Sequence, residues 1–199
     1  NRRLNFTFNV WMIASAPALC YHKGDPGIRR KGCDPMENSA PDKITPAYLT
    51  DRGICPTCYN RTHNWCLTGE EAGRTVFENE RFKCVLIHEP RADGHAVVVS
   101  QEHYKDMMSI PDELCGEMYV FAKKAMIAIK KVYGAESVYL CTMCDGPMNH
   151  FHIQLIPRYD FEKRGSRNFV KERKAYQEDK EKIEKLRELL RPCNTQERM

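Results

Sequence analysis

The stretch that decides the fold reads Asn149-His150-Phe151-His152-Ile153-Gln154-Leu155-Ile156-Pro157-Arg158-Tyr159. From His150 to Leu155, polar and apolar residues alternate, which is typical of a strand with one polar and one apolar face. We therefore expect His150, His152 and Gln154 to point the same way. Neighbours in such a row stand about 6–7 Å apart, within reach of different parts of one small ligand. Pro157 is expected to end the strand, and the simplest alternative is an edge strand that turns its polar residues to solvent.

Length and composition indicate a globular protein with one ordinary core. The chain has 199 residues, of which 42% are hydrophobic and 29% charged, and its formal net charge at pH 7 is +4. A chain of this length is expected to form one domain with appendages. The mild positive charge suits a small anionic substrate and does not by itself argue for nucleic acid. Because no apolar run approaches the ~18 residues that a membrane helix needs, we expect no membrane partner.

The chain has ten cysteines, whose pattern indicates whether its cellular compartment is oxidising or reducing. They are irregularly placed in a chain too large to depend on a disulfide framework, so we expect free thiols, one metal site and a cytoplasmic location. An apolar stretch after Arg2-Arg3 is similar to a signal peptide, although Asn5, Thr7 and Asn9 interrupt it. The alternative is that residues 1–35 are a leader foreign to the fold, with Met36 as the native start.

A metal site is predicted from Cys55-Pro56-Thr57-Cys58, because two cysteines at this spacing commonly bind zinc as thiolates. Two pairs of partners compete for it. The local pair, His63 and Cys66, would make a compact knuckle, whereas the distant pair is His103 and His150. Either set gives a closed tetrahedral site, so the zinc would be structural. The alternative without metal is a reduced pair of core thiols.

The remaining patterns indicate an α+β fold, with an antiparallel sheet of about five strands, one long helix across it and a C-terminal helix. We divide the chain into an N-terminal extension (1–54), a catalytic domain (55–160) and a basic helical segment (161–199). The expected elements besides the central strand are a hairpin of Thr75–Glu78 and Phe82–His88, strands His95–Ser100 and Ser137–Met143, a helix Pro111–Tyr133 capped by Ser109, and a charged helix to about Leu190.

The central stretch resembles the signature of the histidine-triad (HIT) superfamily, His-apolar-His-apolar-His followed by apolar residues and often Pro-Arg. Gln154 stands in place of the third histidine, a pattern similar to the nucleotidyltransferase branch, with its galactose phosphate uridylyltransferases and diadenosine polyphosphate phosphorylases. The resemblance extends upstream to about Cys55. It includes Val97–His103, which matches the family's strand that ends in a histidine, and this favours His103 and His150 as the zinc partners.

This resemblance implies a nucleotidyltransferase or phosphorylase that acts on a nucleotide or dinucleoside polyphosphate through a covalent nucleotidyl-histidine intermediate. His152 is the expected nucleophile, because a neutral imidazole attacks phosphorus well near pH 7. Gln154 can donate a hydrogen bond but cannot carry a proton, so the acceptor should bring its own charge, as orthophosphate or a sugar phosphate does. Asn149, the backbone around Gly146, and His95 are expected to bind substrate. Relatives are usually dimers, which implies a homodimer.

Two rival functions remain open at this stage. The nearest is a HIT hydrolase that uses water as the acceptor, and the sequence separates it from a transferase only through Gln154. The other is a zinc-knuckle module that binds nucleic acid without catalysis, through the basic segment Lys163–Lys174 and the aromatic residues near it. We favour the nucleotide enzyme over nucleic-acid binding.

Overall fold

A computed structural model of the chain describes residues 44–63, 72–144 and 146–191. The chain divides into two units, Asn1–Ala40 and Pro41–Met199, and every described residue belongs to the second. The expected leader, the start at Met36 and the candidate ligand Cys66 lie outside the described residues. None of the helices in the described ranges is both long and apolar enough to cross a membrane.

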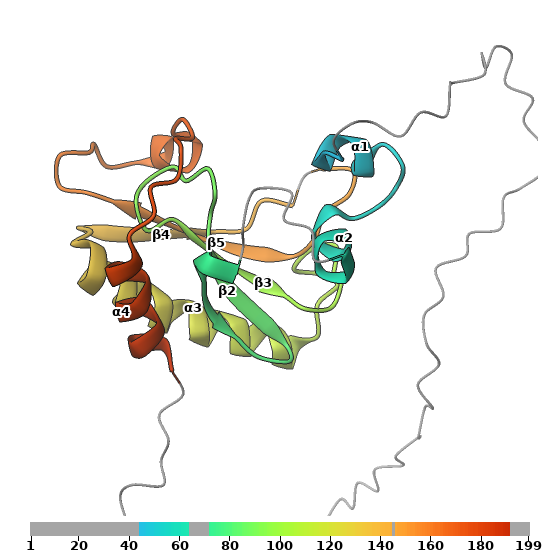
Figure 1. The fold of residues 1–199 in the computed structure, drawn as a ribbon, viewed down its shortest axis with the longest axis horizontal. Helices are drawn as coiled ribbons and strands as arrows, with labels where there is room; N and C mark the ends of the chain where they lie inside the picture. The colour runs from blue at the N-terminus through green and yellow to red at the C-terminus, as the bar shows by residue number, and fades with distance from the viewer. Residues whose placement is uncertain (1–43, 64–71, 145, 192–199) are drawn as a thin grey trace, which may run out of the picture. The chain divides into compact units, whose positions relative to one another are not determined.

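Five antiparallel strands form one sheet in the order β1-β2-β3-β5-β4 (Figure 1). This confirms the expected α+β architecture, although several strands are shorter than their sequence patterns suggested. The hairpin ends at Leu86 rather than His88, and the fourth strand ends at Cys141 rather than Met143. The strands are β1 (Thr75–Glu78), β2 (Phe82–Leu86), β3 (Ala96–Ser100), β4 (Ser137–Cys141) and β5 (His152–Arg158).

The long helix begins at Asp112, one residue later than expected, and its capping residue lies two residues later than expected. Ser109 was expected to cap it, but its hydroxyl bonds within the preceding turn and Pro111 takes the capping position. The helix ends at Gly134, whose left-handed φ of 69° suits glycine. The helices are α1 (Pro46–Thr50), α2 (Pro56–His63), α3 (Asp112–Tyr133) and α4 (Lys180–Leu190), with short 3-10 turns η1 (Ala72–Arg74) and η2 (Ser166–Val170).

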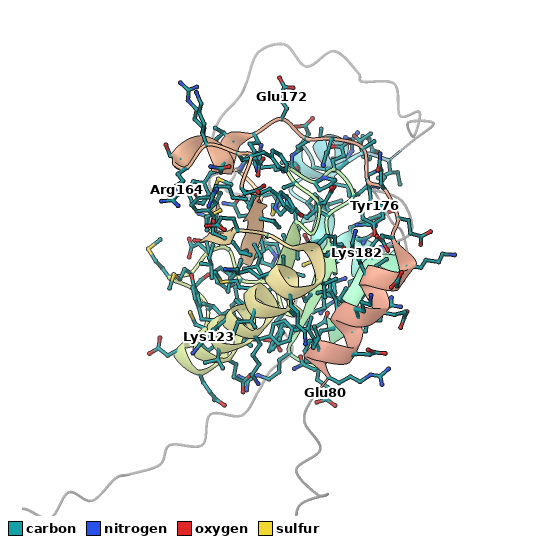
Figure 2. All side chains as sticks on the ribbon, turned by 90° about the vertical axis from the view of Figure 1, so that its left-hand side faces the viewer. Glu80, Lys123, Arg164, Glu172, Tyr176 and Lys182 are labelled. Atoms are coloured by element: carbon teal, nitrogen blue, oxygen red, sulfur yellow. The ribbon has the colours of Figure 1, made fainter. Side chains whose placement is uncertain are left out.

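The two faces of the sheet have different roles. Helices α3 and α4 lie side by side over one face (Figure 2), where Ile153 and Leu155 of β5 are fully buried. Met118 of α3 and Leu186 of α4 belong to the same apolar cluster. Because side chains alternate along a strand, His152 and Gln154 lie on the other face, away from this core. Burial of one face thus leaves the opposite face of β5 available for a site.

Pro157 lies inside β5 instead of ending it, which corrects the expectation from sequence. The strand pairs with β3 only as far as Leu155, and beyond that residue it keeps β4 as its neighbour. The Arg158 carbonyl accepts a hydrogen bond from the β4 side, so the backbone of Pro157 faces the side where β3 has ended. The Pro157 carbonyl there accepts from the Lys171 ammonium at 3.2 Å. Proline is tolerated because no strand needs its missing N–H.

The turn before β3 depends on a glycine. Gly94 has a φ of +77°, and a Cβ atom built there would lie 2.8 Å from Cδ2 of Tyr133 at the end of α3. Both the backbone conformation and the close approach of the ring require the absence of a side chain. The glycine therefore sets how the turn that carries His95 lies against α3.

We predict that Gly94→Ala destabilises the fold more than an alanine at another left-handed glycine. The left-handed conformation costs an alanine about 1–2 kcal/mol, and the contact with Tyr133 adds about 1–3 kcal/mol of overpacking. Gly134→Ala is the matched control, since its φ is +69° and nothing lies within 4 Å of the added Cβ. Denaturant unfolding of both variants measures the difference, and equal losses would show that the ring contact contributes nothing.

Candidate functional site

Four metal-binding side chains from distant parts of the chain converge beside the sheet. Cys55 directly precedes α2, Cys58 lies in its first turn, His103 follows β3, and His150 precedes β5. Their ligand atoms all lie within 4.8 Å of one another. Nδ1 of His150 is 3.5 Å from each sulfur, and Nδ1 of His103 is 3.4 Å from Sγ of Cys58. Sulfur and nitrogen ligands of a tetrahedral zinc ion stand about 3.6 Å apart, so the spacing fits zinc.

Hydrogen bonds around the group orient its ligands for a metal. Nε2 of His150 donates to the Ser100 carbonyl at 2.8 Å, which leaves the Nδ1 lone pair directed at the sulfurs. The pKa of Cys55 is lowered chiefly because the Cys58 thiol donates a hydrogen bond to its thiolate. Two thiols, two imidazoles and an outer hydrogen bond make a closed structural zinc site, as the sequence predicted.

The local alternative for the zinc partners does not match the described geometry. His63 stacks on the Tyr59 ring with centroids 4.0 Å apart, and its Nδ1 lies 3.0 Å from the Tyr59 carbonyl oxygen. The metal-binding group found among the described residues does not include it.

His150 does not belong to the row of polar side chains expected on β5. It precedes the strand, which begins at His152, and it is buried toward the zinc site. The observed row therefore contains His152 and Gln154 alone. An alternating sequence pattern cannot show at which residue strand pairing starts. His150 lies before that point, and its side chain belongs to the metal-binding group instead.

Hydrogen bonds fix which ring nitrogen of His152 carries the proton and which keeps a lone pair. Its Nδ1 lies 2.8 Å from the carbonyl oxygen of His150, to which it donates a hydrogen bond. The proton is thereby placed on Nδ1, and Nε2 keeps its lone pair. The side-chain nitrogen of Gln154 lies 3.3 Å from this Nε2 and donates toward it. The arrangement presents a neutral imidazole with a defined nucleophilic atom.

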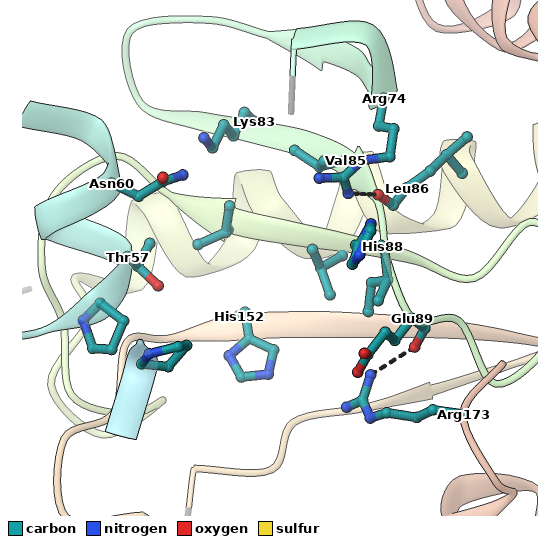
Figure 3. Close-up of a pocket in the computed structure, with 15 residues that line it drawn as sticks. Thr57, Asn60, Arg74, Lys83, Val85, Leu86, His88, Glu89, His152 and Arg173 are labelled. Atoms are coloured by element: carbon teal, nitrogen blue, oxygen red, sulfur yellow. Dashed lines mark hydrogen bonds between the residues drawn. The ribbon is translucent and has the colours of Figure 1, made fainter. Parts of the chain in front are cut away.

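A pocket of about 440 Å³ opens above His152 (Figure 3). Its floor is apolar, from Val85, Val97 and Val99 of β2 and β3, and α2 forms one wall. Such a pocket can hold a flat apolar group and an anionic group together. The polar and charged residues that line it are Thr57, Asn60, Arg74, Lys83, His88, Glu89, His152 and Arg173.

Cations surround the pocket from three separate segments. Arg74 is only 6% exposed and donates to the Leu86 carbonyl at 2.6 Å. Arg173 comes from the segment before α4 and donates to the Glu89 carbonyl at 2.8 Å. Sequence reasoning missed Arg74 and Lys83, although Lys83 is a charged residue in the otherwise apolar strand β2. It considered Arg173 only as part of the basic segment Lys163–Lys174 in the nucleic-acid alternative.

The three expected substrate-binding positions do not line this pocket. Oδ1 of Asn149 accepts from the Gly146 N–H at 2.9 Å and closes the loop before β5. His95 is 1% exposed and lies beneath the surface. Contact of these residues with substrate stays a prediction, as do the homodimer and the cytoplasmic location.

The chain is similar to known proteins over part of its length. The family model of the HIT domain matches residues 68–161. An uncharacterized HIT-like protein of Methanocaldococcus jannaschii is 29% identical over 99 residues, which are 47% of this chain and 75% of that protein. A second, from Saccharolobus solfataricus, is 24% identical over 121 residues, covering 59% of this chain and 87% of that one.

Two solved structures share the fold at low sequence identity. A zinc-bound histidine triad family protein from Mycobacterium smegmatis has a TM-score of 0.53 at 19% identity, with 68% of this chain and 92% of that chain covered. A hypothetical histidine triad nucleotide-binding protein from Sulfolobus tokodaii strain 7 has a TM-score of 0.51 at 22% identity, covering 68% and 89%. The HIT family model thus matches residues 68–161 of this chain, and these two structures share its fold.

Proposed function

We propose that this protein is a nucleotidyltransferase that acts on a nucleotide or dinucleoside polyphosphate through a covalent intermediate on His152. The observation that carries the proposal is the orientation of His152. Its Nδ1–H is bonded to the His150 carbonyl, and its imidazole lines a pocket that also contains three cations. A nucleophile with a fixed tautomer and a surrounding positive charge are what displacement at a phosphate requires.

The reaction has two displacements. Nε2 of His152 attacks the α-phosphorus of the bound nucleotide, the bond from that phosphorus to its bridging oxygen breaks, and the leaving phosphate keeps the electron pair. An acceptor oxygen then attacks the same phosphorus and releases neutral His152. Arg74, Lys83 and Arg173 lower the cost of the charge on the phosphate oxygens in both steps.

Gln154 favours an acceptor that needs no base. Its amide N–H points at Nε2 of His152, beside the position that the attacked phosphorus will occupy. When Nε2 bonds to phosphorus, that N–H becomes available to a non-bridging oxygen. An amide cannot remove a proton from water. We therefore propose orthophosphate or a sugar phosphate as the physiological acceptor.

The zinc site has a supporting role in this scheme. Cys55, Cys58, His103 and His150 would hold the ion, which joins α2 to the segment that leads into β5. The His150 carbonyl orients His152, and α2 forms a wall of the pocket. When bound, the metal would hold the His150 segment and α2 rigidly and would take no part in bond making.

We predict that loss of a zinc ligand affects metal content and stability before it affects chemistry. Cys55→Ser and His103→Ala should purify with little zinc and unfold at lower temperature, because an incomplete tetrahedral site binds metal weakly. His63→Ala is the matched control and should keep about one zinc per chain. Elemental analysis and thermal unfolding measure both properties. Zinc lost from the His63 variant and kept in the His103 variant would identify the local knuckle instead.

A second prediction concerns the nucleophile. His152→Ala should lower kcat by at least about 10³-fold, since the covalent route is lost, while zinc content and unfolding temperature stay unchanged. The substrate tested is diadenosine tetraphosphate with labelled orthophosphate, and label should appear in ADP. Quenching the wild type in alkaline denaturant should leave a nucleotidyl group on His152, detectable by mass spectrometry.

Other products would change the assignment in defined ways. Unlabelled AMP and ATP would identify a hydrolase. If the dinucleotide is not turned over, uridine diphosphate hexose with a hexose phosphate is the next substrate pair. Inactivity toward both donors, or full activity in His152→Ala, would overturn the proposed function.

The third prediction separates the two acceptors. Gln154→His introduces a group that can take a proton from water, and a well-placed base contributes about 10²–10⁴-fold to such a step. We expect the ratio of hydrolysis to phosphorolysis to rise by roughly tenfold or more in this variant. Gln154→Asn, which keeps an amide, is the control. An unchanged ratio in Gln154→His would contradict the role given to the amide.

A further inference from the structure

The side chain of Gln154 can adopt two orientations of nearly equal shape. In one, the amide N–H faces Nε2 of His152, as observed at 3.3 Å. In the other, the amide oxygen would face the same lone pair, and two acceptors would repel each other. Only the first orientation supplies a hydrogen-bond donor beside the reacting atom. Some neighbour must distinguish the oxygen of the amide from its nitrogen.

His95 is the neighbour that can do so. It precedes β3, and the register that pairs Val97 with Gln154 places His95 on the same face of the sheet, diagonally beside Gln154. The backbone N–H of Arg91 donates to Nδ1 of His95 at 3.0 Å. Because a backbone N–H can only donate, Nδ1 must be the acceptor nitrogen, and the ring proton of neutral His95 must lie on Nε2.

Two buried polar atoms remain to be paired. Among the described residues, Nε2 of His95 and Oε1 of Gln154 are both buried without a hydrogen-bond partner, and one is a donor while the other is an acceptor. We propose that His95 is a positioning residue that fixes the amide of Gln154 by directing Nε2–H at Oε1, so that the amide N–H faces His152. The proposal rests on the nucleophilic role proposed for His152.

The environment keeps His95 in the form that this role requires. Burial, followed by the charge of Arg173, lowers the pKa of His95 to about 3, although interaction with the Gln154 amide acts in the opposite direction. The ring is therefore neutral at physiological pH and has one donor and one acceptor. An acceptor oxygen facing His95 is what raises a histidine pKa, in agreement with the orientation inferred for Gln154.

The position of His95 also separates this role from direct substrate contact. Its side chain is 1% exposed and Gln154 is 6% exposed, and neither lines the 440 Å³ pocket in which His152 lies. The proposed hydrogen bonds form one chain, which runs from the Arg91 N–H to His95, from His95 to Gln154, and from Gln154 to His152. His95 would influence the nucleophile only through the amide.

Nuclear magnetic resonance of ¹⁵N-labelled wild-type protein tests the geometry without any assay of activity. We expect His95 as the Nε2–H tautomer and a coupling across the hydrogen bond between Nε2 of Gln154 and Nε2 of His152. A His95 ring protonated on Nδ1, or absence of the coupling, overturns the proposal. This readout does not need a folded variant, and it stays decisive if the proposed function itself fails.

Two variants of His95 test the consequence for catalysis. His95→Gln can accept from Arg91 through its oxygen and donate to Gln154 through its nitrogen, so it should keep the coupling and most of the wild-type kcat. His95→Leu can do neither and should lose the coupling. Its kcat should fall by roughly tenfold or more, up to the 10²–10³-fold that loss of a donor costs, with KM little changed.

A double variant separates positioning from a general structural effect. In a Gln154→Leu background, His95→Leu should have no further effect on kcat, because the amide through which His95 acts is absent. An equal fall in both backgrounds would show that His95 acts by another route and would overturn the proposal. Zinc content, measured in every variant, should remain that of the wild type.

Discussion

The bond from Nδ1 of His152 to the carbonyl of His150 is the interaction on which the rest of the site depends. It places the ring proton on Nδ1 and leaves Nε2, the proposed nucleophilic atom, with its lone pair. His150 is itself fixed, since one of its nitrogens donates to Ser100 and the other faces the two cysteine sulfurs. His150 thus belongs to the metal-binding group through its ring and holds His152 through its carbonyl.

One face of the sheet packs in the apolar core, and the other carries the candidate site. On one face, the apolar residues of β5 pack with α3 and α4, and this burial fixes the strand in the molecule. On the other face, His152 lines a pocket whose floor is apolar and whose polar lining includes three cations, and Gln154 lies beside His152. Side chains of β5 alternate between the two faces. Packing of Ile153 and Leu155 in the core therefore also fixes the positions of His152 and Gln154.

The pocket is completed by segments that lie outside the matched HIT domain. Helix α2, which contains Cys58 and follows Cys55, forms one wall, and the segment before α4 contributes Arg173. The core of the domain therefore supplies the proposed nucleophile, while flanking segments supply much of the surface that a substrate would meet.

The sequence by itself determined the elements whose signals are local. Period-two alternation placed β5, helical periodicity placed α3, and Cys-x-x-Cys indicated a zinc site, because each pattern reflects contacts within a few residues. The tertiary structure alone decided the direction of His150, the tolerance of Pro157 and the arrival of Arg173 at the pocket. Cys55 and His150 are 95 positions apart, and Arg173 follows the strand by many residues. Contacts at such separations depend on which distant segments the folded chain brings together. No local sequence pattern contains that information.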